Sequence, residues 1–138
     1  MTVPFWCLVI AAFLPYVLSG VGGYYKMKQF GSVDIKNPRQ QAAKLEGVGS
    51  RVQAAQDNSW EALAVFTVAV FIAHFAGADA QASATAAMLW VGARIAHPII
   101  YMMDIGPLRT LAFVVALGAV IWLLVLAANA PAMMSLPG

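Results

Sequence analysis

The sequence predicts an all-α integral membrane protein, in which a single domain forms a four-helix transmembrane bundle. The chain of 138 residues is 62% hydrophobic and only 10% charged, whereas charged residues make up about 25% of an average soluble domain. The apolar residues gather in four segments, each close to the ~20 residues that cross the hydrocarbon core of a bilayer. A soluble protein of this size could not bury so much apolar surface, so we expect the lipid bilayer to surround it.

The four predicted helices span residues 4–25, 51–78, 82–103 and 107–129. The second begins with a polar stretch, and its apolar part starts at Trp60. Because only a few residues separate the second, third and fourth segments, consecutive helices should be antiparallel neighbours. Alanine and glycine are frequent in the second and third segments, and such small residues allow helices to pack closely in lipid.

The link between the first and second helices, residues 26–50, is long, polar and basic. Of the eight lysines and arginines, all but Arg94 lie in this loop, directly after it or at the start of the fourth helix. These residues are Lys26, Lys28, Lys36, Arg39, Lys44, Arg51 and Arg109. Cytoplasmic segments of membrane proteins are enriched in such residues. We therefore expect the loop to face the cytoplasm and both termini to lie outside it.

Several kinds of site are not expected. The single cysteine, Cys7, cannot form an intramolecular disulfide. The two histidines, His74 and His97, have no partners at metal-ligand spacing. The N-terminus lacks the basic region of a signal peptide, so the first helix should stay uncleaved. We expect neither a metal ion nor a nucleic acid as partner.

Polar residues inside the predicted helices form two stripes at helical spacing. Ionisable groups in a membrane span cost roughly 2.5–3.5 kcal/mol each, so they usually face a protein interior or a polar cavity. On a helical wheel, the second helix gathers its polar groups within about 120° and the third within about 80°. The stripes comprise Arg51, Asp57, Asn58 and Glu61 on the second helix, and Trp90, Arg94, His97, Tyr101 and Asp104 on the third. With Arg109 and Thr110 of the fourth helix, they predict one polar pocket near the cytoplasmic face.

A structural role is the alternative for several of these residues. Glu61 and Arg94 could neutralise each other as an ion pair inside a packed bundle. His97 could equally be a packed core residue. Arg51 could contact lipid headgroups or the loop instead of a ligand.

Three stretches, in order along the chain, resemble the MAPEG family, the membrane-associated proteins in eicosanoid and glutathione metabolism. The stretch RVQAAQDNSWEA at 51–62 is similar to the family's second helix, which carries an Asn-x-x-Glu motif. The stretches GARIAHPIIY at 92–101 and PLRT at 107–110 are similar to its third and fourth helices, nearest to the prostaglandin E synthase branch. The loop stretch KNPR at 36–39 resembles bacterial members. The resemblance covers nearly the whole chain.

The resemblance implies a homotrimer that binds glutathione between neighbouring subunits, near the cytoplasmic face. Asn58 and Glu61 would hold the glutathione backbone, and Arg109 would lie near its sulfur. Together with the polar stripes, it gives a set of candidate residues for binding glutathione. They are Arg51, Asn58, Glu61, Arg94, His97, Tyr101 and Thr110.

Arg109 is the expected catalytic residue. A free thiol with a pKa near 8.5 is mostly protonated at neutral pH, and a nearby arginine stabilises the thiolate. The N-terminus of the fourth helix also favours an anion. The thiolate would then attack a lipophilic electrophile or peroxide delivered from the bilayer. The expected protein is a membrane-bound glutathione transferase or peroxidase of bacterial type, in the inner membrane.

Departures from the family's pattern keep a second function open. Ala54 and Asp57 stand where family members can carry arginines, and Phe113 stands where they have an aromatic hydroxyl. Fewer cations weaken the grip on the carboxylates of glutathione. The alternative is a non-catalytic membrane trimer that serves as a scaffold or binds lipid. A small multidrug transporter ranks last, because it needs an acid in its first helix and residues 4–25 contain none.

Overall fold

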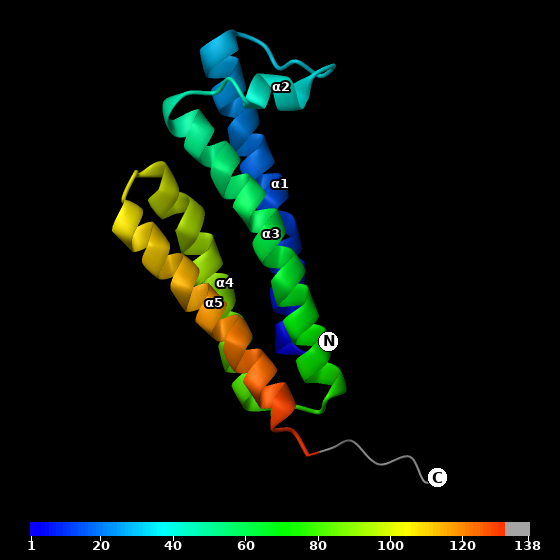
Figure 1. The fold of residues 1–138 in the computed structure, drawn as a ribbon. Helices are drawn as coiled ribbons and strands as arrows, with labels where there is room; N and C mark the ends of the chain where they lie inside the picture. Colours follow the sequence, from blue (N-terminus) through cyan, green and yellow to red (C-terminus); the bar gives the residue numbers. More distant parts are fainter. Residues whose placement is uncertain (132–138) are drawn as a thin grey trace.

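The chain folds entirely into helices over the residues that the structure describes. The computed structural model describes residues 1–131. Its helices are α1 (Val3–Phe30), α2 (Pro38–Ala42), α3 (Gly47–Phe75), α4 (Ala80–Met102) and α5 (Gly106–Ala128). Figure 1 shows the four long helices as two pairs, α1 beside α3 and α4 beside α5. The pairs meet near the N-terminus and spread apart towards the end that carries α2.

Three of the long helices, α1, α3 and α5, are long and apolar enough to cross a membrane. The remaining one, α4, has 23 residues, and at 1.5 Å per residue it is about 34 Å long. Its apolar character is diluted by Arg94 and His97, whose side chains are only 1% and 3% exposed. The helix therefore turns its polar groups inward. Length and composition support three of the four predicted spans.

The first helix is longer, and the loop after it shorter, than the sequence predicted. Only residues 31–46 link α1 to α3, with α2 in the middle, whereas the predicted loop was 26–50. The bounds differ because charged residues such as Lys26 end an apolar segment without ending a helix. Gly31 ends α1 instead, with a φ of +79° and an N–H that donates to the Met27 carbonyl at 2.9 Å. Glycine adopts this left-handed conformation without strain.

Two glutamine side chains hold the linker 31–46 in place. Gln29, in the last turn of α1, donates to the Lys44 carbonyl at 3.0 Å and accepts from the Glu46 N–H at 3.0 Å. Gln41 of α2 makes two similar bonds to the segment that follows α1, at 2.8 and 2.9 Å. The linker is thus a fixed part of the fold rather than an open loop.

The turn between α3 and α4 also starts earlier than predicted. α3 ends three residues before the predicted end at residue 78. Gly77 has a φ of +70°, and its N–H donates to the His74 carbonyl at 3.1 Å. Asp79 then caps α4, because its carboxylate accepts the Ala82 N–H at 2.7 Å. The predicted helix 82–103 therefore begins two residues earlier, at position 80.

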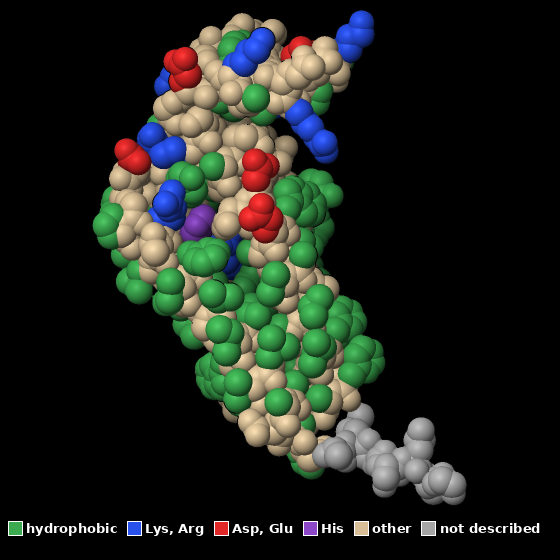
Figure 2. All heavy atoms as spheres, viewed as in Figure 1, with side chains coloured by type: hydrophobic (Ala, Val, Ile, Leu, Met, Phe, Trp, Pro, Cys, Tyr) green, Lys and Arg blue, Asp and Glu red, His purple; other side chains and the backbone are tan. Residues whose placement is uncertain are grey.

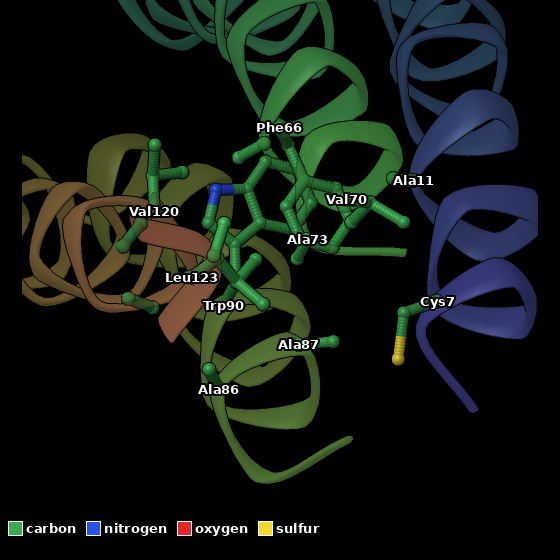
Figure 3. Close-up of a cluster of buried hydrophobic side chains, with 14 residues drawn as sticks. Cys7, Ala11, Phe66, Val70, Ala73, Ala86, Ala87, Trp90, Val120 and Leu123 are labelled. Atoms are coloured by element: carbon green, nitrogen blue, oxygen red, sulfur yellow. The ribbon is translucent and has the colours of Figure 1, made fainter. Parts of the chain in front are cut away.

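The four long helices meet in a core built largely from alanine. At its centre Phe66 of α3 stacks on Trp90 of α4, with ring centroids 3.8 Å apart and ring planes 5° apart. Val120 and Leu123 of α5 and Cys7 of α1 belong to the same buried cluster, and Figure 3 shows these side chains converging from four helices. This core cluster ties the two helix pairs together where they approach each other.

The surface separates charged from apolar side chains along the length of the molecule. Figure 2 shows acidic and basic side chains gathered towards the end that carries α2, while hydrophobic side chains cover much of the rest of this face. Large apolar side chains point outward, for example Phe13 at 62% exposure and Phe75 at 68%. Such a surface is suited to contact with lipid.

Candidate functional site

A polar cavity opens between the two helix pairs at the charged end of the molecule. Its volume is about 480 Å³, within the range of roughly 300–1,000 Å³ that is usual for small-molecule sites. The lining residues are Ala54, Asp57, Asn58 and Glu61 of α3, His97 and Tyr101 of α4, and Arg109, Thr110 and Phe113 of α5. The structure thus brings together every candidate site residue except Arg51 and Arg94.

Arg109 is held at the wall of the polar cavity by an aromatic ring. Its guanidinium carbon lies 4.4 Å from the centroid of the Tyr101 ring, which is a cation–π contact. Arg109 sits in the first turns of α5, where the helix dipole adds to its positive charge. This part of the cavity therefore favours an anion.

Arg94 lies behind the polar cavity and contacts Asn58 rather than Glu61. Its Nη2 donates to Asn58 Oδ1 at 2.7 Å, and its side chain is 1% exposed. The ion pair between Glu61 and Arg94, which was the structural alternative, is absent from the described residues, and Glu61 is exposed. Asn58 uses its side-chain oxygen for this bond, so the two N–H donors of its amide remain for the cavity.

His97 lines the same cavity. It is 3% exposed, and its ring meets the Tyr101 ring edge to face at 5.7 Å and 74°. Its Nδ1 is buried and has no hydrogen-bond partner among the described residues. A buried imidazole nitrogen without a partner is costly, so His97 brings an unsatisfied polar group to this part of the bundle.

Arg51 does not reach the polar cavity. Its Nη2 donates to the carbonyl of Met102, in the last turn of α4, at 3.3 Å. The carbonyl end of a helix attracts a cation, so this contact stabilises the end of α4. The structure places Arg51 in a contact between α3 and the end of α4, whereas the sequence had suggested a ligand, lipid headgroups or the loop as its partner.

A second, apolar cavity adjoins the polar one deeper in the bundle. Its volume is about 210 Å³, and it shares Asn58, Glu61 and Phe113 with the polar cavity. Arg94 and Trp90 line it as well, together with aliphatic side chains of α3 and α5. Sequence patterns did not indicate this cavity, because most of its wall is ordinary apolar residues. Only the place of Trp90 in the polar stripe of α4 pointed towards it.

The fold and the site define a helical membrane protein with a polar cavity at one end, lined by asparagine, glutamate, tyrosine and arginine. The sequence profile of the MAPEG family matches residues 3–129. The chain therefore belongs to the MAPEG family and is an integral membrane protein, which confirms the resemblance found in the three sequence stretches. A comparison with curated proteins finds no significant match.

Proposed function

We propose that the protein is a membrane-bound glutathione transferase or peroxidase. One observation carries the proposal: the Arg109 guanidinium rests on Tyr101 at one wall of the polar cavity, and Asn58 and Glu61 line the same cavity from α3. A cation on one helix and an amide with a carboxylate on another suit glutathione, which carries two carboxylates, an amine and a thiol.

Each group of glutathione has a matching partner in the cavity. The Asn58 amide donates to a carboxylate of the tripeptide, and the exposed Glu61 carboxylate accepts from its amine. Tyr101 and Thr110 contribute hydroxyl groups near the middle of the cavity. These contacts leave the thiol beside Arg109. His97 lines the same cavity, and Arg94 holds Asn58 in place through its hydrogen bond.

Arg109 ionises the bound thiol. Lowering a thiol pKa from about 8.5 to about 6.5 requires roughly 2.7 kcal/mol of preferential stabilisation of the thiolate. A single cation at about 4 Å supplies roughly 4 kcal/mol at an effective dielectric constant near 20. The interaction is therefore large enough to make the thiolate the main form at neutral pH.

The thiolate then reacts with an apolar substrate from the bilayer. With an electrophile, the sulfur forms a bond to carbon and the leaving group departs with its electron pair. With a hydroperoxide, the sulfur attacks the outer oxygen, the O–O bond breaks and the alcohol leaves after taking a proton. A second glutathione converts the resulting sulfenic acid into the disulfide and water. The apolar cavity behind Asn58 and Phe113 offers space for the apolar part of the substrate.

The assembly and topology follow the same proposal. All four long helices span the membrane, and three subunits form a homotrimer in which a neighbour closes the open side of the polar cavity. The linker 31–46 faces the cytoplasm, and both termini lie on the outer side of a bacterial inner membrane. The basic residues around α2 support this orientation and attract anionic glutathione to the cavity mouth.

The test is ultraviolet difference spectroscopy of the thiolate in detergent-solubilised protein at millimolar glutathione. Wild type should show a thiolate band that saturates with glutathione, and Arg109→Ala should lose the band while still binding the tripeptide. Arg109→Lys is the matched control, because it keeps the charge and should keep part of the band. Absence of the band in wild type would refute the proposal.

A non-catalytic membrane trimer is the second candidate, and the cavity wall gives it a specific reason. Asp57 lines the polar cavity with an exposed carboxylate, next to Ala54. The carboxylate accepts a hydrogen bond from Gln53 at 3.0 Å, and its negative charge repels the carboxylates of glutathione. For a scaffold, Glu61→Gln and Arg109→Ala should change the oligomer size in detergent and leave no turnover to lose.

A further inference from the structure

A third cavity lies at the opposite end of the bundle from the polar cavity. Its volume is about 300 Å³, and all four long helices contribute to its wall. Val70 of α3 and Leu123 of α5 line it, and Figure 3 shows both side chains within the core cluster. Phe5 of α1 adds an aromatic ring that meets the His74 ring edge to face at 4.9 Å. The inner part of this outer cavity is therefore apolar.

Two helix N-termini end at this outer cavity. The first residues of α1 and of α4 both line it. The first turn of α1 has no side-chain cap, and in α4 the Asp79 side chain accepts only the Ala82 N–H. N–H groups in the first turn of a helix have no partner within the helix, and together with the helix dipole they attract anions. Two long helices thus direct positive ends towards one cavity.

A buried hydroxyl at the outer cavity has no partner of its own. Ser83 lines the cavity and is 7% exposed, yet its Oγ makes no hydrogen bond within residues 1–131. Serine in a helix commonly satisfies itself on the carbonyl four residues earlier, as Ser59 does on Ala55 at 2.8 Å. Leaving a buried hydroxyl unpaired costs free energy, and a hydrogen bond from Ser83 to a ligand would remove that cost.

From these observations we infer that the outer cavity binds the anionic head of an amphiphile, a phosphate or carboxylate attached to an acyl chain. The Ser83 hydroxyl, the His74 ring and the free N–H groups of α1 and α4 surround the head. Val70, Leu123 and Phe5 receive the first part of the chain. The site is separate from the polar cavity and needs neither glutathione nor turnover. In the proposed orientation it is reached from the outer leaflet.

The Asp79 carboxylate lies at the same helix end and opposes an anion. Its negative charge weakens the binding of an anion. The hydrogen bond from the Ala82 N–H holds this carboxylate at the helix end, so it does not occupy the cavity itself. Asparagine caps a helix as well as aspartate does. Asp79→Asn therefore keeps the fold of the turn, removes the repulsion, and should tighten binding severalfold.

The experiment measures equilibrium binding of radiolabelled oleoyl lysophosphatidate to the full protein in phosphatidylcholine nanodiscs, with empty nanodiscs subtracted. Wild type should bind saturably, one molecule per subunit. Ser83→Ala and His74→Ala should each weaken binding by roughly tenfold, as expected for a hydrogen bond to a charged group. Thr85→Ala is the matched control and should change nothing, because the Thr85 hydroxyl is exposed and donates to the Gln81 carbonyl at 3.0 Å.

Two competitors identify the source of the anion. If inorganic phosphate displaces lysophosphatidate, the ligand is a free anion, whereas failure to displace it assigns the site to a lipid headgroup. Neutral oleoylglycerol should bind at least tenfold more weakly than lysophosphatidate. Equal binding of oleoylglycerol, unchanged affinity in Ser83→Ala, or weaker binding in Asp79→Asn would each overturn the inference.

Discussion

Removing the Asn58 side chain should destabilise the protein more than its position at a cavity wall suggests. Asn58 accepts the hydrogen bond from the Arg94 guanidinium at 2.7 Å, and Arg94 is 1% exposed. Asn58→Ala leaves that guanidinium buried without its partner. A hydrogen bond to a charged group contributes about 1.5–3 kcal/mol, and a buried charged group left without its partner costs more than the ~1–3 kcal/mol of a neutral one. We expect the free energy of unfolding to fall by about 2–4 kcal/mol.

Asn58→Asp separates this structural role from the proposed binding role. A carboxylate still accepts from Arg94, so the free energy of unfolding should stay within about 1 kcal/mol of wild type. The donors of the amide are lost, however, and a second negative charge enters the cavity beside Glu61. Glutathione binding should therefore weaken in both Asn58 variants, by more than tenfold in Asn58→Asp.

The assay is reversible unfolding by dodecyl sulfate in mixed micelles, followed by helical circular dichroism. Asn129→Ala is the matched control, because Asn129 is exposed at the end of α5 and its side chain donates to the carbonyl of Val125, one turn earlier in the same helix, at 2.9 Å. That variant should stay within about 0.5 kcal/mol of wild type. If Asn58→Ala is as stable as the control, Arg94 has another partner and the assigned contact is wrong.

Three further predictions follow from single contacts. Asp57→Arg replaces a repulsive charge in the polar cavity with an attractive one. Glutathione binding, measured by calorimetric titration, should tighten by roughly tenfold or more. Unchanged affinity would place the glutathione carboxylates elsewhere. Tyr101→Leu removes the ring under Arg109 and should abolish the thiolate band, whereas Tyr101→Phe should keep most of it; equal loss in both variants would assign the effect to the hydroxyl instead. Gly31→Ala places a side chain at a φ of +79° and should lower the free energy of unfolding by about 1–2 kcal/mol in the same assay. Gly20→Ala is the control, because Gly20 lies inside α1 with nothing within 4 Å of the added carbon, and it should not lower the stability.

The sequence predicted the long helices because apolar length and helical polar spacing are local signals. It also predicted that Asn58, Glu61, Tyr101 and Arg109 share one site, since each lies on an inward stripe near the same end of its helix. Local signals do not fix where a helix ends beyond the membrane. The extension of α1 to Gly31 therefore needed the structure.

The choice of partners inside the bundle could not be read from the sequence. Arg94 can reach either Asn58 or Glu61 from α4, and which one it meets depends on the rotation of α3 by a fraction of a turn. The contact of Arg51 with the end of α4 depends likewise on how the two helix pairs spread. The outer cavity was hidden for another reason: Ser83 and His74 are unremarkable residues on different helices, and only packing brings them together.

The stacked rings of Phe66 and Trp90 have a consequence for the membrane itself. Along α3, Phe66 comes after the residues of the polar and apolar cavities and before those of the outer cavity, and together with the core cluster it fills the space between the two ends. The closely packed rings and alanines leave no charged side chain of this cluster to bind water between the two ends. The bilayer thus stays electrically insulating even though arginine and histidine lie deep within the bundle.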